Sequence, residues 1–321
     1  MASLPIVDIA GLRSDNTADG AAVAAEIRAA CLDKGFFYIT GHGVQAPLID
    51  AVFGEAKTFF AQPAADKLTI SRELSLCSRG YEPFGFQTLD PGTAPDVKEA
   101  FDIGFDWAAD DPRVGAYPLS QGPNQWPASP AFRRVMSDYF DAMLGLSRLV
   151  MSGLGRSLGL ADDYFDVFCQ DPVVLLRLLH YPAQPAKSMP GEIGAGAHTD
   201  WGAATILLQD DNAGLQVWDS GHGWIHMPPV PDTYVVNLGD LMARWTNDRY
   251  RSTLHRVVNI SGRDRYSVPF FFDGKPDYVV SCLPNCSGPD DPPKYAPVTT
   301  VGHVREKQMA AEPRGPGFQE S

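Results

Sequence analysis

The chain has 321 residues, of which 44% are hydrophobic, 11% aromatic and 20% charged, a composition that predicts a globular protein and excludes intrinsic disorder. Lys and Arg number 26 and Asp and Glu 39, which gives a formal net charge of −13. This negative charge argues against nucleic acid and anionic membrane surfaces as partners, because both are themselves negatively charged.

The first half of the chain is predicted to be mainly helical. Apolar residues at helical spacing predict helices over residues 20–34 and 47–60, and a short aromatic run predicts a buried strand and a turn over 35–44. From 130 to 158, apolar residues recur every three or four positions. This pattern predicts one long amphipathic helix, or two, with one face buried.

From residue 172 onward, the pattern changes to short β-rich runs bounded by Pro, Gly, Asn or Asp. The runs span 173–181, 204–209, 214–218, 234–237, 252–258 and 266–272. Since no helix of crossover length separates most of them, an antiparallel double sheet or jelly roll is favoured over a parallel α/β sheet. One short helix is expected within 238–250.

The two halves are expected to form one compact unit, 1–321, because no linker, repeat or charge block separates them. Within it we expect a mainly helical region over 1–171, a jelly-roll core over 172–283 and a proline-rich, irregular C-terminal segment over 284–321. No apolar run is long enough to span a membrane, and the N-terminus carries charges where a signal peptide would be apolar. These features predict a cytoplasmic protein.

The residues that carry chemistry lie in the β-rich half. His198 and Asp200 are two positions apart, so on a strand both side chains point to the same side. His255 follows about fifty-five residues later, and Arg265 and Ser267 share one face of the next strand. Two imidazoles and one carboxylate on one face of an octahedral metal leave three positions open, which is how proteins hold Fe(II) for oxygen chemistry.

Two of these assignments have rivals in the sequence. His222 and His226 compete with His255 for the place of the second histidine, but only His255 has an Arg-x-Ser motif ten residues further on. Arg263 competes with Arg265 for the place of the arginine that binds a carboxylate. We prefer Arg265 because Ser267 lies on its side of the strand, where a guanidinium and a hydroxyl can together grip a carboxylate.

The ordered set of motifs resembles the isopenicillin N synthase-like family of Fe(II)- and 2-oxoglutarate-dependent dioxygenases. The family pattern is His-x-Asp, a distal His and Arg-x-Ser at these spacings, and further blocks such as GFFYITGHGV at 35–44 and RLLHYP at 177–182 are similar to the family's. The resemblance extends over most of the chain. It implies an α+β fold with a double-stranded β-helix (jelly-roll) core, buttressed by N-terminal and central helices.

The resemblance also implies roles for individual residues. Fe(II) would be held by His198, Asp200 and His255, and Arg265 with Ser267 would fix the distal carboxylate of 2-oxoglutarate, the cosubstrate. Dioxygen (O2) would take the last metal position. The implied enzyme is a 2-oxoglutarate-dependent non-haem iron dioxygenase, an oxidoreductase that hydroxylates, desaturates or cyclises a small organic molecule and releases succinate and CO2.

Two alternatives stay open. One is an oxidase or ethylene-forming type of reaction on the same iron scaffold, and the other is a non-catalytic jelly roll that binds a ligand. The sequence indicates no obligate protein partner. It does not identify the small-molecule substrate, because members of such a family share fold and iron site while acting on different compounds.

The strand over 173–181 carries three further candidates on one face. Tyr181 is expected to contact the carboxylate of 2-oxoglutarate, as the matching tyrosine does in the family. Leu179 stands where many plant members have asparagine, which leaves the orientation of the inner carboxylate open. For Arg177, binding an acidic ligand and pairing with a structural carboxylate are equal alternatives.

Aromatic residues are candidates for the substrate pocket. Phe271 and Arg265 are an even number of residues apart, so their side chains point to the same face of the strand. Phe271 is therefore expected to line the pocket. Tyr81, with its neighbours Phe84 and Phe86, is a candidate for part of the pocket's roof. Aromatic side chains at such spacing also suit an ordinary hydrophobic core.

Overall fold

The computed structural model describes residues 4–90, 93–116, 121–183, 193–259 and 261–311. Its α-helices are α1 (Thr17–Asp33), α2 (Ala46–Phe60), α3 (Ala64–Leu68), α4 (Pro130–Ser157), α5 (Asp240–Trp245) and α6 (Thr300–Ala311). The three longer helices predicted in the first half are confirmed. The Asn16 side chain caps α1 and the Ser129 side chain caps α4, each by accepting a hydrogen bond from a backbone N–H of the first turn.

The strands form two main sheets. They are β1 (Ile6–Asp8), β2 (Phe36–Thr40), β3 (Gly80–Glu82), β4 (Glu99–Ile103), β5 (Val173–Tyr181), β6 (Ala195–His198), β7 (Ala204–Gln209), β8 (Leu215–Asp219), β9 (Gly223–His226), β10 (Tyr234–Leu238), β11 (His255–Val257), β12 (Arg265–Gly274), β13 (Val279–Val280) and β14 (Val298–Thr299). The large sheet has the order β1-β2-β10-β7-β12-β5-β4-β3, the small sheet has the order β6-β11-β8-β9, and β13 pairs with β14. Apart from the parallel β1–β2 pair, neighbouring strands are antiparallel.

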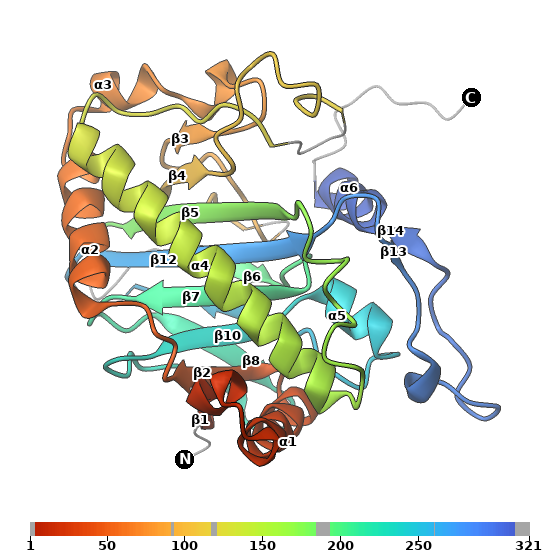
Figure 1. The fold of residues 1–321 in the computed structure, drawn as a ribbon. Coiled ribbons are helices and arrows are strands. Elements are labelled where there is room, and N and C mark those ends of the chain that lie inside the picture. Colours follow the sequence, from red (N-terminus) through yellow and green to blue (C-terminus); the bar gives the residue numbers. More distant parts are fainter. Residues whose placement is uncertain (1–3, 91–92, 117–120, 184–192, 260, 312–321) are drawn as a thin grey trace.

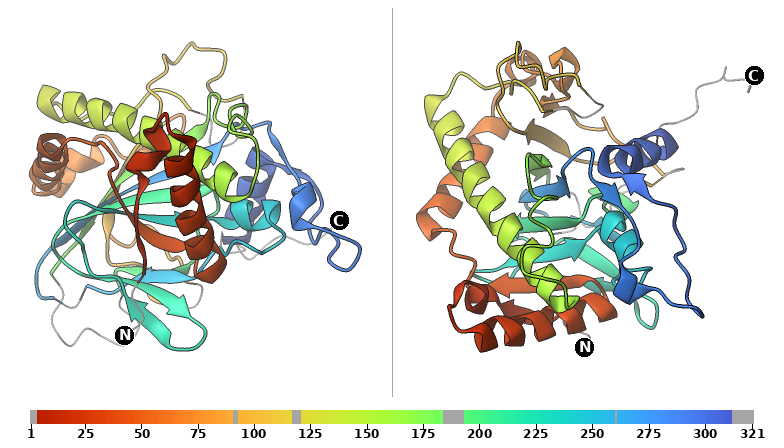
Figure 2. Two further views of the ribbon diagram at one scale, coloured as in Figure 1. Left: turned by 60° about the horizontal axis from the view of Figure 1, so that its bottom comes forward. Right: turned by 45° about the vertical axis from the view of Figure 1, so that its right-hand side comes forward.

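The large sheet is covered on both faces. One face packs against α1, α2 and α4 in a continuous core, and α4 crosses the sheet in the views of Figures 1 and 2. On the other face, Leu179 and Tyr181 pack against Leu215 and Val217 of the small sheet. Because side chains alternate along a strand, the same strands supply both the core under the helices and the space between the sheets. Two facing antiparallel sheets are the predicted jelly-roll arrangement.

Several predictions of local structure are wrong in detail. The strand expected over 252–258 is only His255–Val257, and the short strands β6 and β9, rich in Gly or polar residues, were not predicted. The C-terminal segment was expected to be irregular because of its prolines, but the stretch 298–311 contains none and forms β14 and α6. Strands from the first half, β1 to β4, extend the large sheet at both edges.

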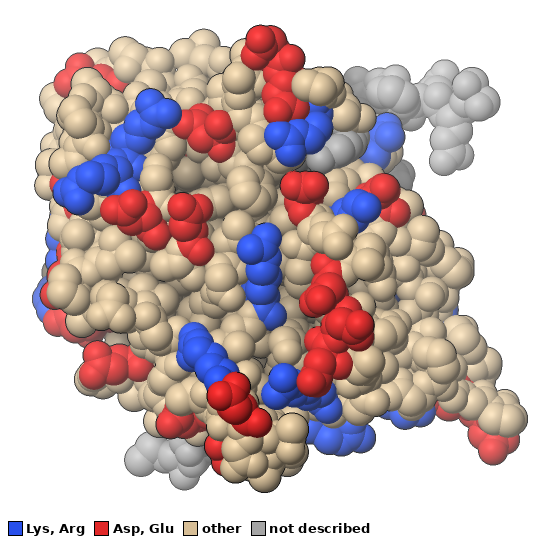
Figure 3. All heavy atoms as spheres, in the orientation of Figure 1, with Lys and Arg blue, Asp and Glu red and all other residues tan. Residues whose placement is uncertain are grey.

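The exterior has a mixed charge. On the face seen in Figure 3, basic and acidic side chains are interspersed and neither sign forms an extended patch. Among the described residues, no helix combines the length and the apolar character that crossing a bilayer requires.

A histidine on α6 makes the stability of the fold depend on pH. His303 is buried, and this burial, followed by the positive charges of Arg244 and Lys307 and opposed by Asp240, lowers its pKa to about 4. The unfolded chain therefore binds a proton below about pH 6.5 that the folded chain does not bind until about pH 4. From this group we expect the free energy of unfolding to fall by about 2 kcal/mol between about pH 7 and pH 4.5.

Urea unfolding of the metal-free protein at both pH values, for the wild type and for His303→Gln, measures this term. The substitution should reduce the loss of stability on acidification, whatever its effect at neutral pH. An equal loss in both proteins would show that His303 does not titrate in this way.

Candidate active site

The small sheet brings the three predicted metal ligands together. His198 ends β6 and lies opposite His255, the first residue of β11, while Asp200 follows His198 by two residues. The Nε2 atoms of His198 and His255 lie 3.8 Å and 3.7 Å from Oδ1 of Asp200. One ligand atom of each residue lies within 4.8 Å of the others, so a single ion about 2 Å from each atom can bridge them.

The backbone fixes the orientation of both imidazole rings. Nδ1 of His198 donates to the carbonyl of Gly196 at 2.7 Å, and Nδ1 of His255 donates to the carbonyl of Thr253 at 3.1 Å. With the proton on Nδ1, the lone pair of Nε2 is directed at the space shared with Asp200. Burial, followed by the charge of His255, lowers the pKa of His198 to about 3. The His198 ring is therefore neutral, as a metal ligand must be.

Two polar side chains of the large sheet hold the carboxylate. Oδ2 of Asp200 accepts from Oγ1 of Thr205 on β7 at 2.5 Å and from Nδ2 of Asn237 on β10 at 2.6 Å. Burial opposes ionisation of Asp200, but the two histidines and these hydrogen bonds outweigh it and hold its pKa below the usual range. Sequence reasoning missed both supporting residues. The available signal was an asparagine in the otherwise apolar strand Tyr234–Leu238.

Removing one of these hydrogen bonds tests the support of the carboxylate. We expect Thr205→Val, which keeps the shape of the side chain, to weaken Fe(II) binding about 10- to 100-fold, because Asp200 is then held by Asn237 alone. Anaerobic Fe(II) titration of the metal-free protein measures the change. Thr199→Val is the matched control, since Thr199 lies between the two ligands but bonds to Asp240 instead. Unchanged affinity in Thr205→Val would refute the role.

Arg265 is buried without a carboxylate partner among the described residues. Its side chain is fully enclosed, Nη1 donates to Oγ of Ser267 at 3.2 Å, and Nη2 donates to Oε1 of Gln209 at 2.9 Å. The guanidinium lies 5.0 Å from the centre of the Tyr181 ring. A Cβ on Gly214 would come within 2.9 Å of the Arg265 side chain, so glycine leaves room for it. A buried cation paired only with neutral groups is costly, and an anionic ligand would offset that cost.

Tyr181 faces Arg265 across the β5–β12 pair. Burial raises the pKa of Tyr181, while the charge of Arg265 and a hydrogen bond to Ser267 act in the opposite direction. The phenol is therefore neutral and can donate a hydrogen bond. The structure thus brings together Tyr181, Arg265 and Ser267.

Arg177 pairs with structural carboxylates. Its guanidinium contacts Asp102 at 2.7 Å and 3.1 Å and Glu82 at 2.6 Å, all three side chains being nearly or fully buried. A further hydrogen bond reaches Gln87 at 3.2 Å. Of the two alternatives for Arg177, these contacts match the structural one.

The rival histidines lie apart from the three ligands. The side chain of His222 is 68% exposed and bonds to Asp219 at 2.8 Å, while His226 is exposed and bonds to Gln216. Neither belongs to the cluster of potential metal ligands found among the described residues.

The aromatic candidates divide between two environments. Phe271 is partly accessible and pairs with Thr205, the residue that supports Asp200, so it lies near Asp200. The role of Tyr81 in the roof is wrong, because Tyr81 packs against Phe59 in the core under the helices and donates to Glu99 at 2.6 Å. The sequence pattern could not show that β3 turns this ring to the helical side.

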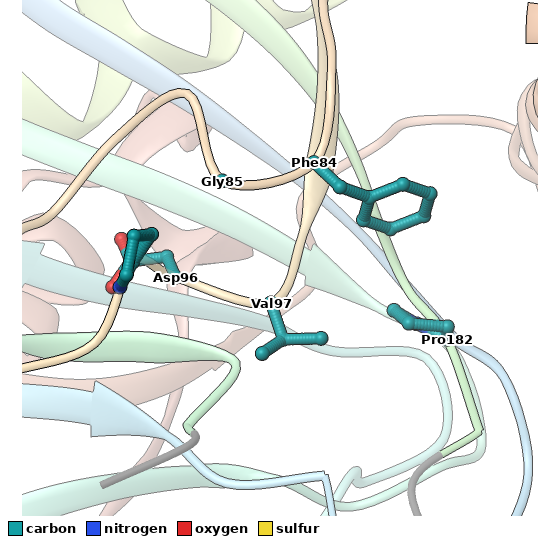
Figure 4. Close-up of a pocket in the computed structure, with 6 residues that line it drawn as sticks. Phe84, Gly85, Asp96, Val97 and Pro182 are labelled. Carbon is teal, nitrogen blue, oxygen red and sulfur yellow. The ribbon is translucent and has the colours of Figure 1, made fainter.

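A surface hollow of about 400 Å³ lies near the start of β4. It is lined by Phe84, Gly85, Pro95, Asp96, Val97 and Pro182, and Figure 4 shows Phe84, Val97 and Pro182 around it. Asp96 links the hollow to β6 by accepting from the backbone N–H of Gly196 at 2.9 Å. Since none of the three predicted ligands lines it, the hollow is not the metal site.

Comparison with known proteins agrees with the fold. A family model described as "non-haem dioxygenase in morphine synthesis N-terminal" matches residues 4–129, and one for the 2OG-Fe(II) oxygenase superfamily matches residues 172–274. A 2-oxoglutarate-Fe(II) type oxidoreductase of Emericella nidulans is 44% identical over 308 residues, 94% of this chain and 88% of that protein. A 2-oxoglutarate-dependent dioxygenase of Monascus ruber is 45% identical over 290 residues, 87% of each chain.

A solved structure is similar over nearly the whole chain. A full-length Neurospora crassa protein, crystallised in complex with alpha-KG, matches with a TM-score of 0.85 and 31% identity over 96% of both chains. The same protein in complex with alpha-KG and thymine has a TM-score of 0.84 and 30% identity, with 96% of this chain and 97% of that chain covered. This similarity confirms the predicted α+β fold with its double-stranded β-helix core.

Proposed function

Since the chain belongs to the 2OG-Fe(II) oxygenase superfamily, we propose that His198, Asp200 and His255 are its Fe(II) ligands. The protein is an oxidoreductase of the 2-oxoglutarate-Fe(II) type that acts on small molecules. The proposed ligand set rests on the distances among the three side chains and on the rings directed at Asp200 by their backbone hydrogen bonds.

The proposal assigns 2-oxoglutarate to the buried cation. Arg265 and Ser267 bind its distal carboxylate, and Tyr181, which faces Arg265, completes the site by donating to an oxygen of the cosubstrate. The single observation that carries this assignment is the enclosed guanidinium with no carboxylate partner in the described chain. A dianion there satisfies Arg265 despite the net charge of −13, because charge-assisted hydrogen bonds act locally.

The proposed reaction couples the cosubstrate to oxidation of a small organic molecule. Bound iron supplies the activation of O2, by which 2-oxoglutarate is converted to succinate and CO2 while the substrate loses two electrons. The chain's own residues position the reactants: the ligands hold the ion, Arg265 fixes the cosubstrate, and the apolar side chains between the two sheets exclude water. Hydroxylation, desaturation and ring closure all satisfy this balance.

Succinate release, measured with and without a panel of candidate compounds, tests the proposal. Thymine belongs in the panel because it was crystallised with the similar Neurospora crassa protein. Succinate release that a compound stimulates, with an oxidised product of matching amount, supports the coupled reaction. An oxidised product without succinate favours an oxidase instead, and consumption of 2-oxoglutarate that yields neither succinate nor an oxidised compound favours an ethylene-forming type of reaction.

A spectroscopic test separates the enzyme from a non-catalytic binding protein. Anaerobic addition of Fe(II) and 2-oxoglutarate should give a weak visible charge-transfer band in the wild type and none in His198→Ala. If the wild type gives no band, the proposed function is wrong.

A further inference from the structure

The inward face of β12 carries a carboxylate that the proposed function does not use. Side chains alternate along the strand, so Asp273 shares the face of Arg265, Ser267 and Phe271. Its side chain is partly accessible, although the strand lies in the middle of the large sheet. Asp273 therefore faces the space between the sheets.

Asp273 forms no hydrogen bond or ion pair with any residue in the described part of the chain. Its carboxylate lies against Gly202, where a Cβ would come within 1.9 Å of Oδ1 of Asp273, so the loop after Asp200 leaves room for it only because residue 202 is glycine. Burial, followed by the charge of Asp200 and opposed by Arg79, raises the pKa of Asp273 to about 7. A partly accessible carboxylate without a protein partner is free to accept hydrogen bonds from a molecule in the space it faces.

The nearby cation does not provide such a partner. Arg79 is buried, and its terminal nitrogens already donate to the carbonyls of Cys77 and Ser78 and to Oε1 of Gln121. These contacts hold the guanidinium away from an ion pair with Asp273. The hydrogen bonds that Asp273 lacks must come from water or from a ligand.

The position of Asp273 along β12 favours the substrate as that ligand. Arg265 and Ser267 lie at the start of the strand, Phe271 lies opposite Thr205 and hence beside Asp200, and Asp273 comes after Phe271. Eight residues of strand separate Arg265 from Asp273, a distance of about 27 Å between their backbones. A five-carbon acid held by Arg265 cannot reach that far, so the cosubstrate does not satisfy Asp273.

We propose that Asp273 is a specificity-determining residue that accepts a hydrogen bond from an N–H or O–H group of the substrate. The substrate is then a neutral or cationic molecule with such a donor, and a molecule that places a carboxylate there is excluded by Asp273 and Asp200 together. This inference rests on the proposed function, which puts the iron beside Asp200. The inference adds the chemical class of the substrate to that proposed function.

Pairs of small probes that differ in one donor test the inference. Thymine is compared with 1,3-dimethylthymine and phenol with anisole, and phenylacetate serves as the anion. Binding to the full chain, loaded with Zn(II) in place of iron and with 2-oxoglutarate, is measured by ligand-observed NMR titration. In the wild type we expect the donor-bearing member of at least one pair to bind about tenfold tighter or more than its methylated partner, and phenylacetate not to compete.

Two variants separate the hydrogen bond from the charge. Asp273→Leu should abolish the preference for the donor, whereas Asp273→Asn, which retains an acceptor of the same shape, should keep part of it and admit phenylacetate. Asp277→Asn is the matched control, because Asp277 is an exposed carboxylate four residues further along the chain. It should behave as the wild type does.

The outcomes distinguish this inference from the proposed function. Any of three results would overturn the inference about Asp273. The first is an equal preference for the donor in the wild type and in Asp273→Leu, and the second is tight binding of phenylacetate to the wild type. The third is that no donor-bearing probe binds at millimolar concentration. If the wild type nevertheless shows the Fe(II)–2-oxoglutarate absorption band, the proposed function stands and only the role of Asp273 fails.

Discussion

Replacing Arg265 with leucine should raise the KM for 2-oxoglutarate by a factor of about 100 or more. The guanidinium is fully enclosed, and the proposed function gives it at least two charge-assisted hydrogen bonds to the distal carboxylate. Each such bond contributes about 1.5–3 kcal/mol, and about 1.4 kcal/mol corresponds to a factor of ten. Initial rates of succinate release at varied 2-oxoglutarate concentration measure the change.

A neighbouring arginine provides the control for this experiment. Arg263→Leu removes the same charge two residues away, but Arg263 is exposed and lies 3.4 Å from Asp211 on the surface. Its KM should stay within about twofold of the wild-type value, since exposed ion pairs contribute little. If Arg265→Leu retains the wild-type KM while Arg263→Leu does not, the two assignments are reversed. If neither variant changes the KM, the cosubstrate is held elsewhere.

Replacing His255 with alanine should abolish Fe(II)-dependent activity. The variant leaves a two-residue site of His198 and Asp200, and the loss should exceed the roughly 100-fold effect of removing a residue that only supports a ligand. Anaerobic Fe(II) titration and succinate release measure binding and turnover. Since His255 also packs edge-on against Phe36 at 5.3 Å, circular dichroism must confirm that the variant is folded.

His226→Ala is the informative partner for this variant. His226 was one of the two rival ligands in the sequence and is exposed on β9, where Gln216 is its hydrogen-bonding partner. The His226→Ala variant should bind Fe(II) as the wild type does. Wild-type iron binding in folded His255→Ala would contradict the proposed ligand set.

The sequence predicted those parts of the fold that depend on local pattern. Strands β5 and β7 begin and end where the β-rich runs and their flanking turn residues place them, and α4 ends within one residue of its expected end. The short strand β6 was missed because Gly and Ala dominate it, and it exists through pairing with β11. Such pairing joins residues far apart in the chain, which local propensity does not encode.

The residues of the candidate site also divide into those that the sequence pattern could identify and those that it could not. Spacing and strand parity were enough to single out His198, Asp200 and His255, because a strand carries both first ligands to one side. Thr205 and Asn237 could not be found in this way, since each reaches Asp200 from a different strand of the large sheet. Asp273 escaped notice for a related reason: only the three-dimensional structure shows that its carboxylate lies against Gly202 in the loop after Asp200.

The order of strands in the large sheet has a consequence for any attempt to shorten the protein. The strands β10 and β5 belong to the second half of the chain, but their outer edges are paired with β2 and β4 from the first half. Without the first half, both edges would present unpaired backbone N–H and C=O groups, which recruit strands from other molecules. Expression of the second half alone should therefore give aggregates, so the N-terminal strands protect the iron-binding half against self-association.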